Sequence, residues 1–119
     1  MTEYIVLIVG DADRWWTTMS MQERADGYAE YERFGQALAE GGHKVTGGAE
    51  LKPSTTARTV RPDTLEITDG PYAESAEQVG GFYQVETDDL DGLLECCKII
   101  AGLGDAVQVV PTVSPEERP

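Results

Sequence analysis

Residues 4–9 read Tyr-Ile-Val-Leu-Ile-Val, and this stretch is the strongest fold signal in the chain. Every position is apolar and most are β-branched, so both faces of the segment need cover. This pattern is typical of a strand in the middle of a sheet. Gly10 and Asp11 end the strand, and we expect residues 11–19, which include Trp15 and Trp16, to form a loop.

A capped helix is predicted after this loop. Ser20 and Glu23 have the spacing of a capping box, in which each side chain accepts a backbone N–H of the first turn. Apolar side chains then recur every three or four residues, and Gly41 and Gly42 stop the pattern. The members of this stripe are Tyr28, Tyr31, Phe34 and Leu38.

Short strands are predicted in the middle of the chain. Residues 43–51 form one, and Gly47-Gly48 within it indicates a bulge or a close backbone approach. Residues 56–61 and 64–68 have the pattern of a hairpin. A compact turn at 69–72, a short helical turn at 73–79 and a strand at 82–86 follow.

The last third of the chain predicts a second helix and a final strand. Residues 87–89, Thr-Asp-Asp, supply oxygen atoms that can cap the helix. An apolar stripe follows, made of Leu90, Leu93, Leu94, Cys97, Ile100 and Ala101. We interpret Cys97 as a small core residue rather than a nucleophile. The strand covers residues 106–110 and stops at Pro111.

This order of elements predicts an α+β fold of ferredoxin-like βαββαβ type with an inserted hairpin. Both helices would cover one face of an antiparallel sheet. The other face would remain bare, and a second copy of the sheet would cover it in a homodimer that closes an α+β barrel. We expect one domain at residues 1–111 and a polar tail at residues 112–119.

Charge restricts the partners of the protein. The chain of 119 residues has a formal net charge of -13, which argues against direct nucleic-acid binding and against docking on an anionic membrane. Basic residues gather at Lys44, Lys52, Arg58 and Arg61. This segment predicts a contact with a small anionic ligand or with the acidic half of a second subunit, and the alternative is a solvated strand face.

The cysteine and histidine counts restrict location and cofactors. Cys96 and Cys97 are adjacent and do not suit an ordinary disulfide, which fits a reducing, cytoplasmic setting. His43 is the single histidine, so no zinc ligand set is expected, and no metal or other cofactor is predicted. The first residues lack the positive charge of a signal peptide.

Residues 68–83, TDGPYAESAEQVGGFY, resemble the signature of the DGPF subgroup of YCII-related proteins, which reads T-D-G-P-F-A-E-x-K-E-x-L-G-G-F/Y. The resemblance extends to residues 4–11 and to residues 85–91, and it covers most of residues 3–110. It implies the dimeric α+β barrel. It also implies that some relatives are cofactor-free enzymes that use a His–Asp pair for proton transfer. Many DGPF relatives have no assigned activity, and some are encoded beside sigma factors.

This chain departs from that family pattern in two places. Tyr72 stands where the motif has Phe, and the first long helix contains no histidine to match the His–Asp pair. Asp69 is the candidate catalytic residue, as a partly desolvated base or ligand anchor. The alternative is that Asp69 only accepts backbone N–H groups of the Asp-Gly-Pro turn.

Further candidate ligand-binding residues have equally ordinary alternatives. Arg58 and Arg61, expected on one strand face, are candidates to grip an anionic group. Tyr72 is a candidate donor, His43 a candidate base or ligand contact, and Trp15 and Trp16 a candidate lid. Tyr72 could instead be a core aromatic, the two tryptophans could cover the sheet edge or the dimer seam, and His43 could be a surface or cap residue. Glu74 and Glu77 are more simply solvated than metal-binding.

Two functions follow from these residues. The first is a small-molecule-binding barrel, with a cofactor-free lyase or isomerase as its possible chemistry and the ligand near Asp69, Tyr72 and Arg58. The second is a non-catalytic interaction or regulatory protein. The family resemblance and the acid, phenol and bases expected in adjacent strands make the first the leading hypothesis, and the missing histidine and the acidic exterior motivate the second.

Overall fold

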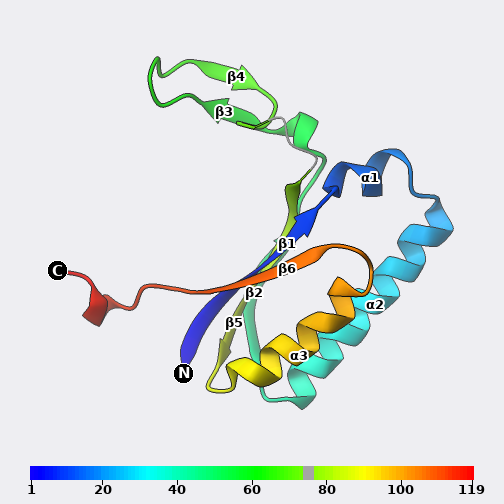
Figure 1. Ribbon diagram of the computed structural model, residues 1–119, viewed down its shortest axis with the longest axis vertical. Coiled ribbons are helices and arrows are strands. Elements are labelled where there is room, and N and C mark those ends of the chain that lie inside the picture. The colour runs from blue at the N-terminus through cyan, green and yellow to red at the C-terminus, as the bar shows by residue number, and fades with distance from the viewer. Residues whose placement is uncertain (74–76) are drawn as a thin grey trace.

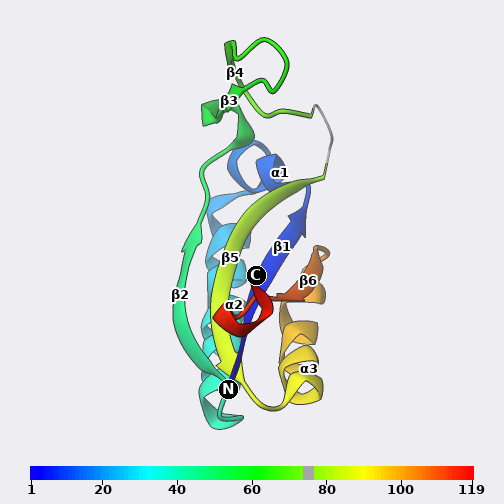
Figure 2. The ribbon, with the colours of Figure 1, turned by 90° about the vertical axis from the view of Figure 1, so that its left-hand side faces the viewer.

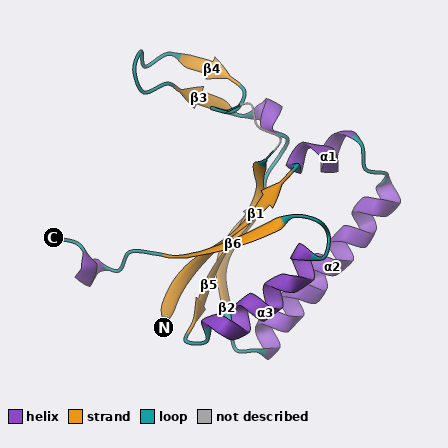
Figure 3. Cartoon of the chain, in the orientation of Figure 1, coloured by secondary structure: helices purple, strands orange, loops and turns teal. Residues whose placement is uncertain are grey.

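The computed structural model describes residues 1–73 and 77–119. The chain forms an antiparallel sheet with two long helices on one face and a small hairpin beyond the end of the sheet (Figures 1 and 3). The strands are β1 (Thr2–Gly10), β2 (Lys44–Glu50), β3 (Arg58–Val60), β4 (Ile67–Asp69), β5 (Gln78–Thr87) and β6 (Ala106–Pro111). The helices are α1 (Ala12–Thr17), α2 (Met21–Glu40) and α3 (Leu90–Ala101), with short 3₁₀ turns η1 (Ser54–Thr56) and η2 (Pro115–Glu117).

The main sheet has the strand order β2-β5-β1-β6, with every neighbouring pair antiparallel. In its centre Val6 of β1 lies opposite Tyr83 of β5 and Val109 of β6. This order, with α2 and α3 on one face, is that of a ferredoxin-like α+β fold. The α+β prediction is therefore confirmed for the single chain, and residues 4–9 do form a central strand.

The core lies between the sheet and the two long helices. Val6 and Ile8 of β1 and Val85 of β5 are buried against Phe34 and Leu38 of α2. Helix α3 adds Leu93, Cys97 and Ile100. Side chains alternate between the two faces of a strand, so Ile5, Leu7 and Val9 lie on the opposite face of β1.

Both long helices begin as the sequence predicts. The Ser20 hydroxyl accepts the Glu23 N–H at 3.0 Å, and the Glu23 carboxylate accepts the Ser20 N–H at 3.0 Å, which completes the capping box. The Asp89 carboxylate accepts the Gly92 N–H at 3.0 Å at the start of α3. Helix α2 stops where Gly42 takes a φ of 77°, a conformation that suits glycine.

Three local predictions are wrong. Residues 12–17 are helical rather than a loop, because the Asp11 carboxylate accepts the Arg14 N–H at 3.2 Å and caps α1. Gln78 and Val79 belong to β5 rather than to a helical turn, and residues 74–76 of that prediction lie outside the described residues. Arg58 and Arg61 do not share a strand face, because β3 ends at Val60 and Arg61 is three positions after Arg58, an odd step that would point to the other face of a strand.

The other predicted features of the middle segment are present. The register of β2 against β5 shifts between Val45 and Gly47, so the expected bulge is there. Strands β3 and β4 form the expected hairpin as a separate two-stranded sheet. This hairpin extends beyond the end of the main sheet and away from α2 and α3 (Figure 1).

One face of the main sheet is uncovered in the described chain. Figure 2 looks onto this face, with α2 and α3 behind the sheet and the C-terminal tail in front of it. The molecule extends over 49 × 43 × 17 Å, and its radius of gyration is 16.0 Å. A compact chain of this length would have a radius of about 13.5 Å, so the hairpin and the tail stand away from the body.

Candidate functional site

A cavity of about 330 Å³ lies at one end of the sheet, between the sheet, α1 and α2. The ends of β1 and β2 and the start of β5 form its floor, and Asp105 closes one side. Its lining includes six aromatic residues, Trp15, Trp16, Tyr28, Tyr31, Phe82 and Tyr83. We call this cavity the aromatic pocket.

Local packing holds the aromatic walls in place. The ring of Trp15 meets the ring of Tyr28 edge-on, with centroids 5.0 Å apart. Gly27 makes this possible, because a Cβ at that position would stand 2.6 Å from a carbon of the Trp15 ring. The Tyr28 hydroxyl donates to the Glu50 carboxylate, whose two oxygens lie 2.8 and 3.1 Å away. This bond is the main cause of the raised pKa of Tyr28.

Asp105 is the carboxylate most affected by the pocket. Burial raises its pKa above the ordinary value of 3.8, while Arg14 counteracts the rise and Asp11 adds to it. Gly10 makes room for this side chain, because a Cβ on Gly10 would overlap the Asp105 carboxylate. Burial also raises the pKa of Tyr83, and it raises the pKa of Tyr31 to about 12. Both phenols therefore stay protonated at neutral pH.

The lining of the pocket is mainly apolar and contains few polar groups. The indole N–H of Trp15 is buried and makes no hydrogen bond of acceptable geometry in the described part of the chain. Glu50 and Asp105 are acidic, and none of the described lining residues is Lys, Arg or His. Such a site can enclose a small organic molecule and offer it a carboxylate and phenol hydroxyls.

The candidate site residues predicted from the sequence do not lie together in the structure. Trp15 and Trp16 line the aromatic pocket. Asp69, Tyr72, Arg58 and Arg61 lie on or beside the β3–β4 hairpin and are absent from the described lining. Within one chain, the three residues expected around the ligand, Asp69, Tyr72 and Arg58, therefore lie apart from the two tryptophans.

The hairpin residues contact one another instead. The Arg58 Nε lies 3.5 Å from the Asp69 carboxylate, with the two side chains 75% and 88% exposed. The Arg61 guanidinium lies 5.3 Å from the centre of the Tyr72 ring. An ion pair this exposed adds little stability. Beside this turn, the Gly70 N–H donates to the Ala57 carbonyl at 2.7 Å, a backbone bond that continues the pairing of β3 with β4 and does not involve the Asp69 carboxylate.

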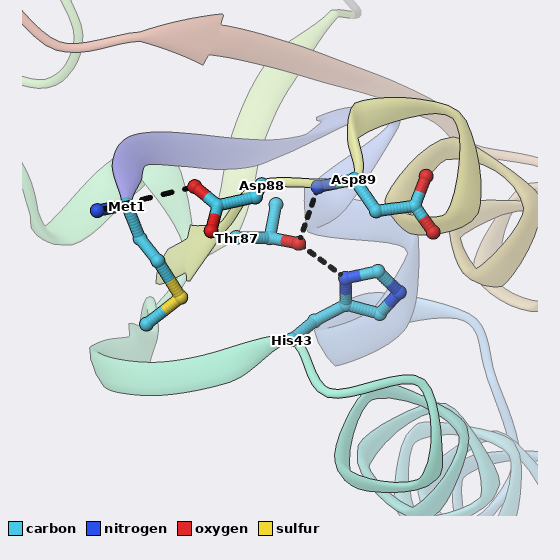
Figure 4. A network of polar contacts seen from close by, with 5 residues as sticks. All are labelled: Met1, His43, Thr87, Asp88 and Asp89. Atoms are coloured by element: carbon cyan, nitrogen blue, oxygen red, sulfur yellow. Dashed lines mark hydrogen bonds and ion pairs between the residues drawn. The ribbon is translucent and has the colours of Figure 1, made fainter.

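His43 is a buried structural residue at the other end of β2 from the pocket. Its Nδ1 lies 2.7 Å from the Thr87 hydroxyl, which also accepts the Asp89 N–H at 3.0 Å (Figure 4). Gly41 and Gly92 lie against the imidazole, where a Cβ would stand 2.7 and 3.1 Å from ring atoms. His43 thus joins the end of α2 to the start of α3, and it does not belong to the aromatic pocket.

The remaining candidates are distributed as follows. Cys97 is buried, and burial raises its pKa to about 11, so the interpretation as a core residue is confirmed. Glu74 lies outside the described residues. Within the described ranges, His, Cys, Asp and Glu side chains form no group of three that could hold a metal ion. None of the helices described is long and apolar enough to span a bilayer.

Sequence reasoning missed most of the pocket. The helical pattern assigns Tyr28 and Tyr31 to the core stripe of α2, and it gives no role to Glu50, Tyr83 or Asp105. Gly27 was an available signal, since a glycine inside a helix costs stability and needs a packing reason. No local pattern connects residues 15, 28, 50 and 105, which only the fold brings together.

The fold and the pocket define a small α+β protein with ferredoxin-like topology and an aromatic pocket at one end of its sheet. Residues 3–111 match the YCII-related domain, so the chain belongs to the YCII-related family. A stretch of 49 residues is 43% identical to Uncharacterized protein R00369 of Rhizobium meliloti (strain 1021). This match covers 40% of the present chain and 40% of that protein.

Proposed function

We propose that this YCII-related protein binds a small organic molecule in the aromatic pocket. The observation that carries the proposal is a cavity of about 330 Å³ with aromatic walls and a partly desolvated carboxylate, Asp105. Ligand sites are commonly of this size, mainly apolar, and supplied with a few polar groups that orient the ligand. Gly10 and Gly27 leave space for Asp105 and Trp15, so the walls are formed before a ligand arrives.

The chemistry proposed for this site is cofactor-free proton transfer of the lyase or isomerase type. A carboxylate whose pKa is raised by burial is a stronger base than an ordinary aspartate, and Asp105 has this property. Asp69 remains the candidate drawn from the family motif. It would reach a pocket only in an assembly that brings a hairpin against it.

A homodimer is part of the proposal. Ile5, Leu7 and Val9 give the uncovered sheet face an apolar centre, and Val110 adds to it with 39% of its surface exposed. Apolar faces of this kind are stabilised by burial against another layer. The hairpin and the C-terminal tail extend on the same side, where a second copy would contact them (Figure 1).

The alternative is a non-catalytic interaction or regulatory protein, including one connected with sigma-factor-dependent transcription. The observation that favours it is the exposure of apolar side chains on the hairpin. Val60, Leu65 and Ile67 are 63%, 73% and 68% exposed. The residues that resemble the DGPF motif, 69–72, begin on this hairpin. Arg58 and Arg61, which are expected to bind a small anionic ligand, lie on it as well.

A ligand screen on two variants tests where binding occurs. A metabolite library is screened by thermal shift on the wild type, on Trp16→Ala in the pocket, and on Tyr72→Ala in the hairpin as a matched aromatic control. A ligand at a hundred times its Kd stabilises the native state by about 2.7 kcal/mol. We expect ligands that raise the melting temperature of the wild type and of Tyr72→Ala but not of Trp16→Ala.

The opposite response of the two variants would place the ligand outside the aromatic pocket. A response lost in Tyr72→Ala and retained in Trp16→Ala would place the ligand at the hairpin and contradict the proposal. A library without any stabilising ligand would favour the interaction protein. In that case, pairing of the hairpin with another protein becomes the function to test.

A further inference from the structure

The charge and wall chemistry of the aromatic pocket indicate the class of its ligand. Two tryptophans and three tyrosines contribute to the walls. The faces of aromatic rings carry negative potential and attract cations, and Trp is the most effective. Glu50 and Asp105 add carboxylates to the same enclosure.

The charged side chains around the pocket do not cancel the negative charge of its lining. Arg14 influences Asp105, and Arg24 influences Tyr28, so two guanidinium groups lie in the surroundings. Asp11 lies near Asp105, and the Asp13 carboxylate accepts the Ser54 N–H at 2.8 Å. Four carboxylates therefore accompany two guanidinium groups, and both lining charges are negative.

An anion, a neutral molecule and a cation would interact differently with this site. An anion would meet two carboxylates and the negative ring faces. A neutral molecule would strip water from Asp105 and offer it no opposite charge, and at best a neutral hydrogen bond, so the desolvation of the carboxylate costs free energy. A cation attached to an apolar body gains from the rings and compensates the carboxylate that it desolvates.

We propose that the aromatic pocket binds an organic cation, an alkyl- or aryl-substituted ammonium group, between the tryptophan and tyrosine rings and Asp105. This inference rests on the proposed small-molecule site and specifies its ligand class. Glu50 acts mainly as a positioning residue, since it holds the Tyr28 hydroxyl at 2.8 Å and thereby the ring against Trp15.

Three probes of the same shape and different charge provide the test. They are choline, its neutral isostere 3,3-dimethylbutan-1-ol, and the anion 3,3-dimethylbutanoate. The chain contains two tryptophans, and both line the pocket, so intrinsic tryptophan fluorescence reports on this site. Sodium chloride at equal ionic strength is the control for salt effects.

We expect choline to change the fluorescence saturably and to bind at least about tenfold more tightly than the neutral isostere, as cation–π contacts and a partly buried carboxylate allow. Asp105→Asn should reduce choline affinity by about tenfold and leave the neutral probe unchanged. Glu32→Gln, which removes a negative charge from the exposed side of α2, is the matched control and should bind as the wild type does.

The outcomes of this test separate the preference for a cation from the proposal that the pocket binds a small molecule. Equal or tighter binding of the neutral or anionic probe would overturn the cation preference and leave the pocket as a ligand site. A saturable choline response that Asp105→Asn does not weaken would overturn the role of Asp105 in that preference. No response to any of the three probes at their highest soluble concentrations would overturn the cation preference, while the metabolite screen decides whether the pocket binds a small molecule.

Discussion

At the residue scale, Asp105 has the most perturbed surroundings of the pocket carboxylates. Its carboxylate occupies space that Gly10 leaves open, and burial raises its pKa above 3.8. Between the unfolded and folded pKa values the native state holds more protons than the unfolded state. The free energy of unfolding therefore falls as pH rises through this window, and the cost persists at neutral pH.

Asp105→Asn should accordingly increase the free energy of unfolding at pH 7, because the variant removes a partly desolvated charge. The gain over the wild type should shrink as pH falls toward 3.8, where the wild-type carboxyl also becomes neutral. Urea titrations of both proteins across this range measure the difference. A destabilised Asn variant at pH 7 would instead show that favourable contacts hold the charge of Asp105.

At the element scale, capping decides where the helices begin. The capping box of Ser20 and Glu23 was readable from spacing alone and is present in α2. Helix α1 was not predicted, because its six residues are too few to show a helical period. Its Asp11 cap and the packing of Trp15 against Gly27 form it in the context of the fold.

Ser20→Ala should lower the free energy of unfolding by about 1 kcal/mol, because the Glu23 N–H loses its acceptor at the exposed start of α2. Ser20→Asp should restore most of that loss, since Asp is an equally good N-cap. Chemical denaturation of the three proteins compares them. Equal stability of Ser20→Ala and the wild type would mean that the first turn of α2 does not contribute to global stability.

At the scale of the whole molecule, the described chain leaves one face of its main sheet open and is less compact than is usual for its length. One sheet face has no cover in the described chain, and the radius of gyration of 16.0 Å exceeds that of a compact chain of this length, about 13.5 Å. The apolar side chains of β1 point to both faces, so helices alone leave half of them without a partner. The dimer remains a prediction that assembly measurements decide.

We expect the wild type to sediment as a dimer at micromolar concentration, with an interface of about 2,000 Å² or more in total. Leu7→Glu should produce a monomer, because it introduces a charge at the centre of the uncovered face. Ala29→Glu adds the same charge at an exposed position of α2 and should remain dimeric. A wild type that sediments as a stable monomer would contradict the predicted interface.

The sequence by itself determined most of the local elements and the class of fold. Runs of apolar residues, capping boxes and glycine stops depend on neighbours along the chain, so β1, α2, β5 and α3 were predictable, as was the burial of Cys97. Family membership was also visible, because the motif at residues 68–83 is continuous in sequence.

Only the tertiary structure decided where the candidate site lies. The pairing of β3 with β4 brings Asp69 and Arg58 together on the hairpin, as the sequence suggests, but the hairpin extends away from α2 and α3. The aromatic pocket instead joins Trp15, Tyr28, Glu50 and Asp105. These residues are far apart in the chain, and their proximity follows from how the sheet and helices pack, which no local sequence pattern encodes.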